Sequence, residues 1–301
     1  MKEITILSGK GGTGKTSITA ALSSIAAEAV FCDNDVDAAD LHLILQPEIK
    51  ERHIFEGAWV ASIDADKCDG CGICQSNCRL NAIHFLHGQY EINPYQCEGC
   101  RLCERTCPNG AITSNRSRNN EWYISDTRFG PMVHARMGPG EENSGKLVTL
   151  IRNKALELAD DKKARYILND GPPGIGCSAI AAISGTDQVL LVIEPTQSGL
   201  HDLQRLVELV NSFRVPMAAL INKHDLNLEV TKQVEIFLEN KQIPLLARIP
   251  FDDTVVKAMI EGKSVIEFAP DSTITKQLRE VWRQITKEES LRSGKSFIHH
   301  N

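Results

Sequence analysis

Long hydrophobic runs and clusters of basic residues are both absent from this sequence of 301 residues. No apolar stretch approaches the ~18 residues that a transmembrane helix needs, so we expect no stable insertion into a membrane. No long run of Lys or Arg occurs and the formal net charge is -6, so a nucleic-acid partner is not favoured. The first residues, Met1-Lys2-Glu3, lead into an apolar segment rather than an export signal, which predicts a cytoplasmic protein.

Cysteine, by contrast, is abundant, with ten residues in the chain. In a secreted protein this number would suggest disulfides, but the missing export signal favours a reducing compartment and metal binding. Eight of the ten fall into two similar runs, Cys68-x2-Cys71-x2-Cys74-x3-Cys78 and Cys97-x2-Cys100-x2-Cys103-x3-Cys107. This spacing is typical of two 4Fe-4S clusters, in which the fourth cysteine of each run serves the other cluster.

The crossed pattern predicts which cysteines share a cluster. One cluster would bind Cys68, Cys71, Cys74 and Cys107, and the other would bind Cys97, Cys100, Cys103 and Cys78. Structural zinc is the alternative, but zinc would use four cysteines in two separated pairs and would leave the duplication of the runs unexplained.

The two runs lie in an internal duplication, and every cysteine of the second run follows its counterpart at a constant offset. Between them, Ile83–Ile92 alternates around a glycine and predicts a hairpin. We expect residues 58–115 to form a small α+β unit that resembles a bacterial ferredoxin. One departure is visible, because Pro108 follows the last cysteine but Arg79 follows Cys78. We predict that Arg79 raises the reduction potential of the neighbouring cluster.

A second motif opens the chain, where Lys2–Ser8 predicts a strand, Lys15–Glu28 a helix and Val30–Asp33 another strand. The connection between the first strand and the helix is a phosphate-binding loop. Its nucleotide-binding residues are Gly9, Lys10, Gly11, Gly12, Thr13, Gly14, Lys15, Thr16 and Ser17. The glycines allow close approach of a phosphate to backbone N–H groups, Lys15 can reach the terminal phosphates and Thr16 can ligate Mg²⁺.

The rest of the chain alternates apolar strands with helices. Strands are predicted at 166–170, 188–193, 217–221 and 245–249, and helices at 200–213 and 230–240. Such alternation predicts an α/β fold, with a mostly parallel sheet buried between helices on both faces. An apolar stripe at helical spacing over 274–285 predicts a last helix packed on this sheet.

The predicted order of segments makes the larger domain discontinuous. It comprises residues 1–57 and 116–288, with the 58–115 unit inserted and a flexible tail at 289–301. Within it, the polar stretch 115–145 reads as a linker and surface loop. Cys177 is the one spare thiol expected near the phosphate loop, and we predict that it is a small buried residue.

Lys10, directly after the first glycine of the loop, is unusual. With it, the loop resembles the deviant phosphate loop of the MinD and nitrogenase-iron-protein group of ATPases. The resemblance implies that Lys10 reaches the nucleotide of a partner subunit in a homodimer that forms on ATP binding. It also implies a first switch at Asp33-Asn-Asp35-Val-Asp37 and a second switch at Asp170-Gly-Pro-Pro-Gly174. In that group, the residue matching Asp35 orients the attacking water and the residue matching Asp170 helps to hold Mg²⁺.

The base that the site accepts is less directly encoded. Asn222-Lys-His-Asp225 matches a pattern of guanine-binding GTPases, in which the aspartate accepts hydrogen bonds from guanine. In MinD-like proteins an asparagine at this strand end contacts adenine instead. Because the other motifs follow the ATPase group, we expect ATP, with Asn222 as a base contact. The expected catalytic set is Lys10, Lys15 and Asp35, with Mg²⁺ held by Thr16, Asp35 and Asp170.

Together the motifs resemble MinD-superfamily ATPases that carry an inserted ferredoxin unit. The first functional hypothesis is a slow ATPase that gates electron transfer through two 4Fe-4S clusters to a redox partner protein. A cluster carrier of the Mrp/NBP type, which would deliver iron–sulfur to an acceptor protein, is the second, although no cysteine pair follows Cys177. A redox-responsive spatial regulator like MinD is the third.

Overall fold

The structure is a computed structural model that describes residues 1–138, 141 and 144–287. These residues form two compact units. The first contains residues 1–52, 123–135 and the described residues from 145 onward, and the second contains residues 53–122 and the described part of 136–144. The sequence had placed its insert at 58–115. The predicted tail at 289–301 lies outside the described residues.

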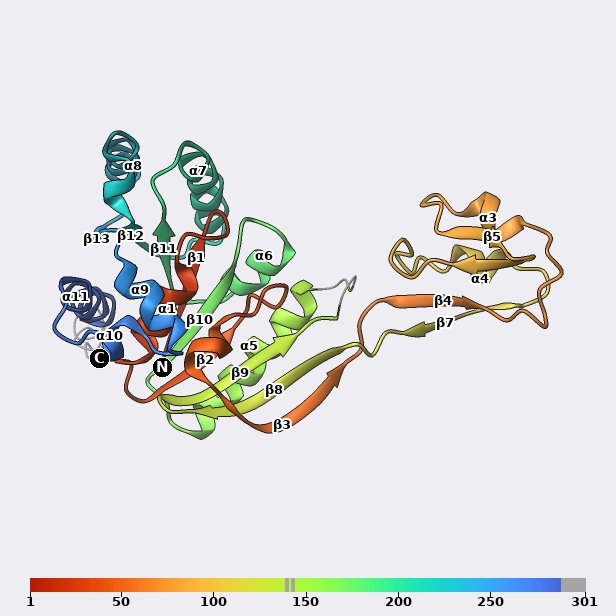
Figure 1. Cartoon of the computed structure of the whole chain (residues 1–301), viewed down its shortest axis with the longest axis horizontal. Coiled ribbons are helices and arrows are strands. Elements are labelled where there is room, and N and C mark those ends of the chain that lie inside the picture. The colour runs from red at the N-terminus through yellow and green to blue at the C-terminus, as the bar shows by residue number, and fades with distance from the viewer. Residues whose placement is uncertain (139–140, 142–143, 288–301) are drawn as a thin grey trace, which may run out of the picture. The chain divides into compact units, whose positions relative to one another are not determined.

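The first unit is built on a large sheet with the strand order β13-β12-β11-β1-β10-β2-β9-β8-β3 (Figure 1). The pairs from β13 through β9 are all parallel. Strands β3 and β8 also carry the chain across the boundary between the units. The strands are β1 (Lys2–Ser8), β2 (Ala29–Asp33), β3 (Glu48–Phe55), β8 (Asn120–Thr127), β9 (Gly130–Arg136), β10 (Tyr166–Pro173), β11 (Gln188–Ile193), β12 (Met217–Asn222) and β13 (Leu245–Ile249).

Helices cover both faces of this sheet. Successive side chains of a strand point to opposite sides, so apolar strands present two faces that must be buried. In β1, Ile4 and Ile6 pack with α1 and α11, whereas Leu7 packs with α7 and α8. The helices are α1 (Lys15–Ser23), α2 (Leu41–Leu45), α5 (Ser144–Asp161), α6 (Cys177–Ile183), α7 (Gln197–Ser212), η1 (His224–Leu226), α8 (Leu228–Asn240), α9 (Asp253–Ile260), α10 (Val265–Phe268) and α11 (Thr273–Lys287). The expected parallel sheet and its packed last helix are confirmed.

The second unit holds two small antiparallel sheets. Strand β4 (Trp59–Ile63) pairs with β7 (Ile112–Arg116), and β5 (Ile83–Leu86) pairs with β6 (Gln89–Ile92) in the predicted hairpin. Two short helices, α3 (Ile73–Asn77) and α4 (Leu102–Thr106), occupy equivalent places in the two halves of the duplication. Their shared core is small and consists of Ala61, Cys74, Ile83 and Ile112.

Two expectations about local structure were wrong. The stretch 115–145 is not a linker, because strands β8 and β9 lie within it and join the large sheet. Gly130-Pro131 and the many polar residues gave it the composition of a loop, yet backbone pairing with β2 at Phe31 and Cys32 recruits this segment. Helix α1 ends at Ser23 rather than Glu28, which adopts a left-handed conformation with φ of 55°. No helix among the described residues is long and apolar enough to cross a membrane.

Candidate nucleotide site and cysteine cavities

The phosphate loop connects β1 to α1 with the backbone geometry that an anion site requires. Gly12 and Gly14 have φ values of 77° and 89°, in the left-handed region that favours glycine. Gly14 caps α1 without any side-chain hydrogen bond, and the first backbone bond of the helix runs from the Ile18 N–H to the Gly14 carbonyl. The first N–H groups of α1 therefore remain available, and with the helix dipole they favour a bound phosphate.

Asp170, at the end of β10, is the centre of the polar contacts beneath this loop. Its fully buried carboxylate accepts hydrogen bonds from Thr16 Oγ1 at 2.8 Å and Thr19 Oγ1 at 2.7 Å. Lys15 Nζ lies 2.9 Å from Asp170 and 3.5 Å from Asp35. Burial acts to lower the pKa of Lys15, but the two carboxylates outweigh it and raise the pKa above its ordinary value. Lys15 is therefore held as a cation next to the loop.

Asp33 ends β2 and Asp35 and Asp37 follow it, so three carboxylates crowd into the same region. Burial and the neighbouring Asp170 raise the pKa of Asp33 well above its ordinary value, even though backbone N–H groups of Asp35 and Leu41 donate to it. Burial raises the pKa of Asp35 to about 6, against the attraction of Lys15. Burial also raises the pKa of Asp37. Close carboxylates of this kind favour binding of a cation.

The oxygen atoms at this site suit Mg²⁺. Thr16, Asp35 and Asp170 are hard oxygen donors, and Mg²⁺ is ordinarily held by one or two carboxylates together with waters and substrate phosphates. Among residues 1–138, 141 and 144–287, no three His, Cys, Asp or Glu side chains form a group that could hold a metal ion by themselves. A site completed by phosphate and water needs no such cage.

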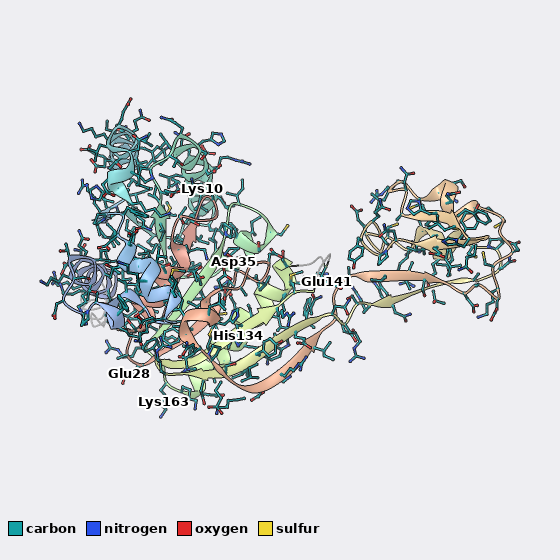
Figure 2. The ribbon with its side chains drawn as sticks, viewed as in Figure 1. Lys10, Glu28, Asp35, His134, Glu141 and Lys163 are labelled. Atoms are coloured by element: carbon teal, nitrogen blue, oxygen red, sulfur yellow. The ribbon has the colours of Figure 1, made fainter. Side chains whose placement is uncertain are left out.

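Lys10 is bound within its own chain. Its ammonium lies 2.8 Å from Glu194 Oε2 and donates to Thr196 Oγ1 at 2.9 Å. Figure 2 labels Lys10 and Asp35 within the first unit. Lys223 holds the other oxygen of Glu194 at 2.9 Å. Burial acts to raise the pKa of Glu194, but these two lysines outweigh it and keep the pKa below its ordinary value. Sequence reasoning gave Glu194 no role, because nothing in its loop pairs it with Lys10.

A cavity of about 400 Å³ opens from the phosphate loop toward α9, α10 and α11. Asn222 lines it and donates to the Thr13 carbonyl at 2.8 Å, while Lys223 donates to the Gly12 carbonyl at 3.0 Å. Asp225 is not among the lining residues, and its carboxylate accepts a hydrogen bond from the Phe251 N–H at 2.7 Å. The aspartate of the guanine-binding pattern therefore does not line this cavity, although Asp252 at the start of α9 does.

The second unit brings the cysteines together in the two predicted sets. One cavity is lined by Cys68, Cys71, Cys74 and Cys107, and the other by Cys78, Cys97, Cys100 and Cys103. Burial raises the pKa of Cys74 and of Cys103. Each half contains an equivalent hydrogen bond to a cysteine sulfur. The Ala82 N–H donates to Cys78 Sγ and the Ala111 N–H donates to Cys107 Sγ, both at 3.3 Å.

This donor set fits a 4Fe-4S cluster better than a single ion. Each thiolate of such a cluster ligates a different iron, so the sulfur atoms surround a space rather than converge on one point. Backbone N–H groups directed at cysteine sulfur are among the contacts that tune such clusters.

Two remaining sequence predictions concern exposed side chains. Cys177 begins α6 and is exposed, so the prediction that it is buried was wrong. The apolar residues around it did not reveal that a helix start would leave it at the surface. Arg79 has a side chain that is 74% exposed and pairs with Glu98, and it is not among the residues that line either cysteine cavity.

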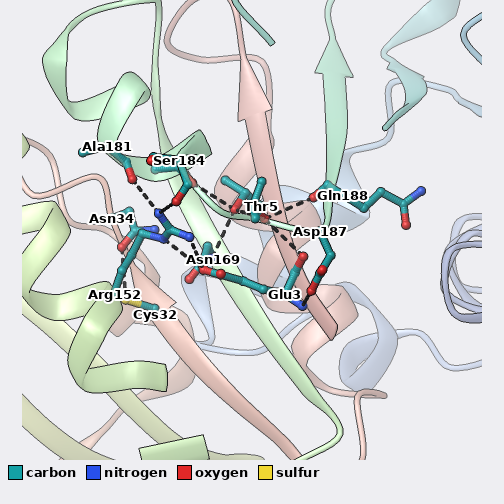
Figure 3. A network of polar contacts seen from close by, with 12 residues as sticks. Glu3, Thr5, Cys32, Asn34, Arg152, Asn169, Ala181, Ser184, Asp187 and Gln188 are labelled. Carbon is teal, nitrogen blue, oxygen red and sulfur yellow. Dashed lines mark hydrogen bonds and ion pairs between the residues drawn. The ribbon is translucent and has the colours of Figure 1, made fainter. Parts of the chain in front are cut away.

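A buried polar network, which no sequence motif indicated, surrounds the Glu3 carboxylate (Figure 3). Arg152 of α5 donates to Glu3 Oε1 through Nε at 2.9 Å and Nη2 at 2.7 Å. The same guanidinium donates to the carbonyls of Ala181 and Ser184, both at 2.6 Å. Asn169, the residue before Asp170, donates to Glu3 Oε1 at 2.6 Å. The network thus joins α5 and the end of α6 to the strand that carries Asp170.

Comparison with known proteins gives one family match and several relatives. The sequence model of the CobQ/CobB/MinD/ParA nucleotide-binding domain matches residues 4–265. An uncharacterized protein of Methanocaldococcus jannaschii is 31% identical over 94% of this chain and 96% of its own length. A cytosolic Fe-S cluster assembly factor NUBP1 homolog of Caenorhabditis briggsae is 22% identical over 94% of this chain and 80% of its own.

Solved structures show the same fold. The septum site-determining protein MinD of Pyrococcus horikoshii, in complex with Mg-ADP, superposes with a TM-score of 0.61 at 18% identity. The match covers 97% of this chain and 98% of that one.

Proposed function

Because this chain belongs to the CobQ/CobB/MinD/ParA nucleotide-binding family, we propose that it is a Mg²⁺-dependent ATPase that controls a module carrying two 4Fe-4S clusters. The observation that carries the proposal is the pairing of two sites in one chain. A phosphate loop with a buried Lys15–Asp170 pair occupies one unit, and two four-cysteine cavities occupy the other.

At the nucleotide site, the residues position phosphate and neutralise its charge. Backbone N–H groups at the start of α1 and the ammonium of Lys15 bind the phosphate oxygens. Thr16, Asp35 and Asp170 supply oxygen atoms for Mg²⁺, and Asp35 orients the attacking water.

ATP is the proposed nucleotide. The absence of Asp225 from the cavity lining and its bond to the Phe251 N–H leave guanine without its usual acceptor. Asn222 stays beside the loop through its bond to the Thr13 carbonyl and contributes to the base end of the cavity. A competition assay in which GTP displaces ATP at lower concentration would overturn this choice.

In the second unit, Cys68, Cys71, Cys74 and Cys107 would hold one cluster and Cys78, Cys97, Cys100 and Cys103 the other. Such clusters, when bound, supply one-electron redox chemistry. The chain's own contribution is to surround the clusters with apolar side chains and to direct the Ala82 and Ala111 N–H groups at ligand sulfur.

The link between the two sites is a change of conformation that depends on the terminal phosphate. Glu194 and Thr196 hold Lys10 within its own chain. We infer a homodimer in which Lys10 leaves these partners for the nucleotide of the second subunit. Nucleotide binding would then shift the population of states and control electron transfer to a partner protein.

The test uses the full chain purified without oxygen. We expect about eight irons per chain, slow MgATP hydrolysis, and midpoint potentials or oxidation rates that differ between nucleotide-free, ADP and non-hydrolysable ATP states. Lys10→Ala should keep the iron and lose the nucleotide-dependent difference. Lys263→Ala, which alters an exposed lysine paired with Glu261, is the matched control and should keep both. Potentials and rates that are identical in all three nucleotide states would overturn the proposal of ATP-gated electron transfer.

Similarity to the NUBP1 homologues favours a second candidate, an ATP-dependent carrier that passes iron–sulfur clusters to an acceptor protein. This candidate predicts that the iron of the purified protein appears in an added apo-acceptor and that ATP accelerates the transfer. Full retention of iron during repeated reduction and oxidation would support electron transfer instead.

A further inference from the structure

The two cysteine cavities are built by equivalent halves of a duplication, but one position differs in kind. Directly after the second cysteine of each run stands Gly72 in the first half and Arg101 in the second. Both residues precede a short helix, and both have left-handed φ values, 74° for Gly72 and 61° for Arg101. Glycine adopts this conformation freely, whereas an arginine there is uncommon. The second half therefore has an arginine in a backbone conformation that favours glycine.

Arg101 is held in place from two sides. Its guanidinium stacks 4.4 Å from the centre of the Trp59 ring and donates to Glu104 at 2.8 and 3.2 Å. Trp59 is itself fixed, because Arg116 also packs 4.4 Å from its ring centre. A Cβ added at Gly99 would lie 2.1 Å from the Trp59 carbonyl oxygen. The start of β4 therefore packs directly against the loop between Cys97 and Cys100. The charge of Arg101 thus stays next to the second cavity.

Among the residues that line the two cavities, the charge differs only at this position. Both linings include an acidic residue at the equivalent place, Asp69 in the first and Glu98 in the second. Within the described part of the chain, Arg101 is the only lysine or arginine that lines either cavity. Arg79, which the sequence singled out, is exposed and does not line them.

We propose that Arg101 makes the two clusters unequal, so that the cluster held by Cys78, Cys97, Cys100 and Cys103 has the higher reduction potential. The inference rests on the proposed function, since it requires that both cavities hold clusters. Reduction adds negative charge, and a fixed cation beside the cavity stabilises the reduced form. Glu104 offsets part of this charge, which makes the Arg101–Glu104 pair the element that sets the difference.

Potentiometric titration of the anaerobically purified full chain, followed by electron paramagnetic resonance, tests this assignment. Arg101→Gly installs the residue that the first half uses at the same φ, so folding should be retained. We expect the higher of the two midpoint potentials to move to a more negative value and the lower one to stay. Glu104→Gln should move the higher potential in the opposite direction. Arg118→Gln, which alters an exposed residue of the same unit that lines neither cavity, is the control and should move neither potential.

Iron counts separate the possible failures. If the wild-type chain lacks iron, the proposed function fails and this inference fails with it. If the wild type and Arg101→Gly both hold about eight irons but no potential moves, only the inference is overturned. A shift of the lower potential alone would overturn it as well.

Discussion

The buried ion pair between Glu3 and Arg152 offers the sharpest quantitative prediction about the first unit. Their side chains are 5% and 7% exposed, and Arg152 makes four hydrogen bonds, two to Glu3 and two to backbone carbonyls. Arg152→Met would leave the Glu3 carboxylate buried without its cation and two carbonyls without a donor. Breaking a buried pair in this way destabilises a protein by about 3–5 kcal/mol.

Urea denaturation followed by circular dichroism measures this loss. We expect the midpoint of unfolding to fall by about 1 M or more in Arg152→Met. Lys154→Met provides a matched control on the same helix, because Lys154 is 37% exposed and pairs with Glu157 at the surface. A surface pair of this kind contributes about 0–1 kcal/mol. The double variant Glu3→Gln/Arg152→Met should recover part of the loss, because no unpaired charge remains buried.

The same variants report on the nucleotide site. Asn169 donates to the Glu3 oxygen that Arg152 also binds, and Asp170 follows Asn169 in β10. We therefore expect Arg152→Met to weaken the binding of a fluorescent ATP analogue, whereas Lys154→Met should not. The reasoning would be refuted by an Arg152→Met protein that is no less stable than Lys154→Met.

Three further predictions concern single positions. Gly14→Ala should abolish ATP binding in a calorimetric titration, because a Cβ there would lie 2.3 Å from Asn222 Nδ2 at a φ of 89°. Burial lowers the pKa of His134 to about 4, so this ring stays neutral in the fold while the unfolded chain takes up a proton below about pH 6.5. Stability should thus fall by up to about 3 kcal/mol as the pH drops from 6.5 toward 4, and His134→Gln should flatten that part of a denaturation-versus-pH curve. Asp225→Ala should leave the preference for ATP over GTP unchanged, and a loss of GTP binding in this variant would contradict our account of the base site.

The hydrophobic pattern of short segments was sufficient to predict much of the fold. Strands β11 and β12 are continuous apolar runs, and such runs are recognised where a sheet is buried on both faces. The last helix was equally clear, because Ile274, Leu278, Val281 and Ile285 recur at helical spacing and are all buried. Strands β8 and β9 were not predicted from the sequence. They mix polar residues with Gly130 and Pro131, and the pairing of β9 with β2 joins segments far apart in the sequence.

The sequence by itself determined the phosphate loop, the family of the nucleotide-binding domain and the grouping of eight cysteines, because each depends on residues at fixed short spacing. Tertiary structure decided which side chains those motifs meet. Glu194 binds Lys10 from a loop far away in the sequence. Arg152 pairs with Glu3, which also accepts a hydrogen bond from Asn169, the residue before Asp170. Trp59 fixes Arg101 beside one cysteine cavity. These contacts join residues that are far apart along the chain, and local pattern carries no information about such pairs until the backbone brings them together.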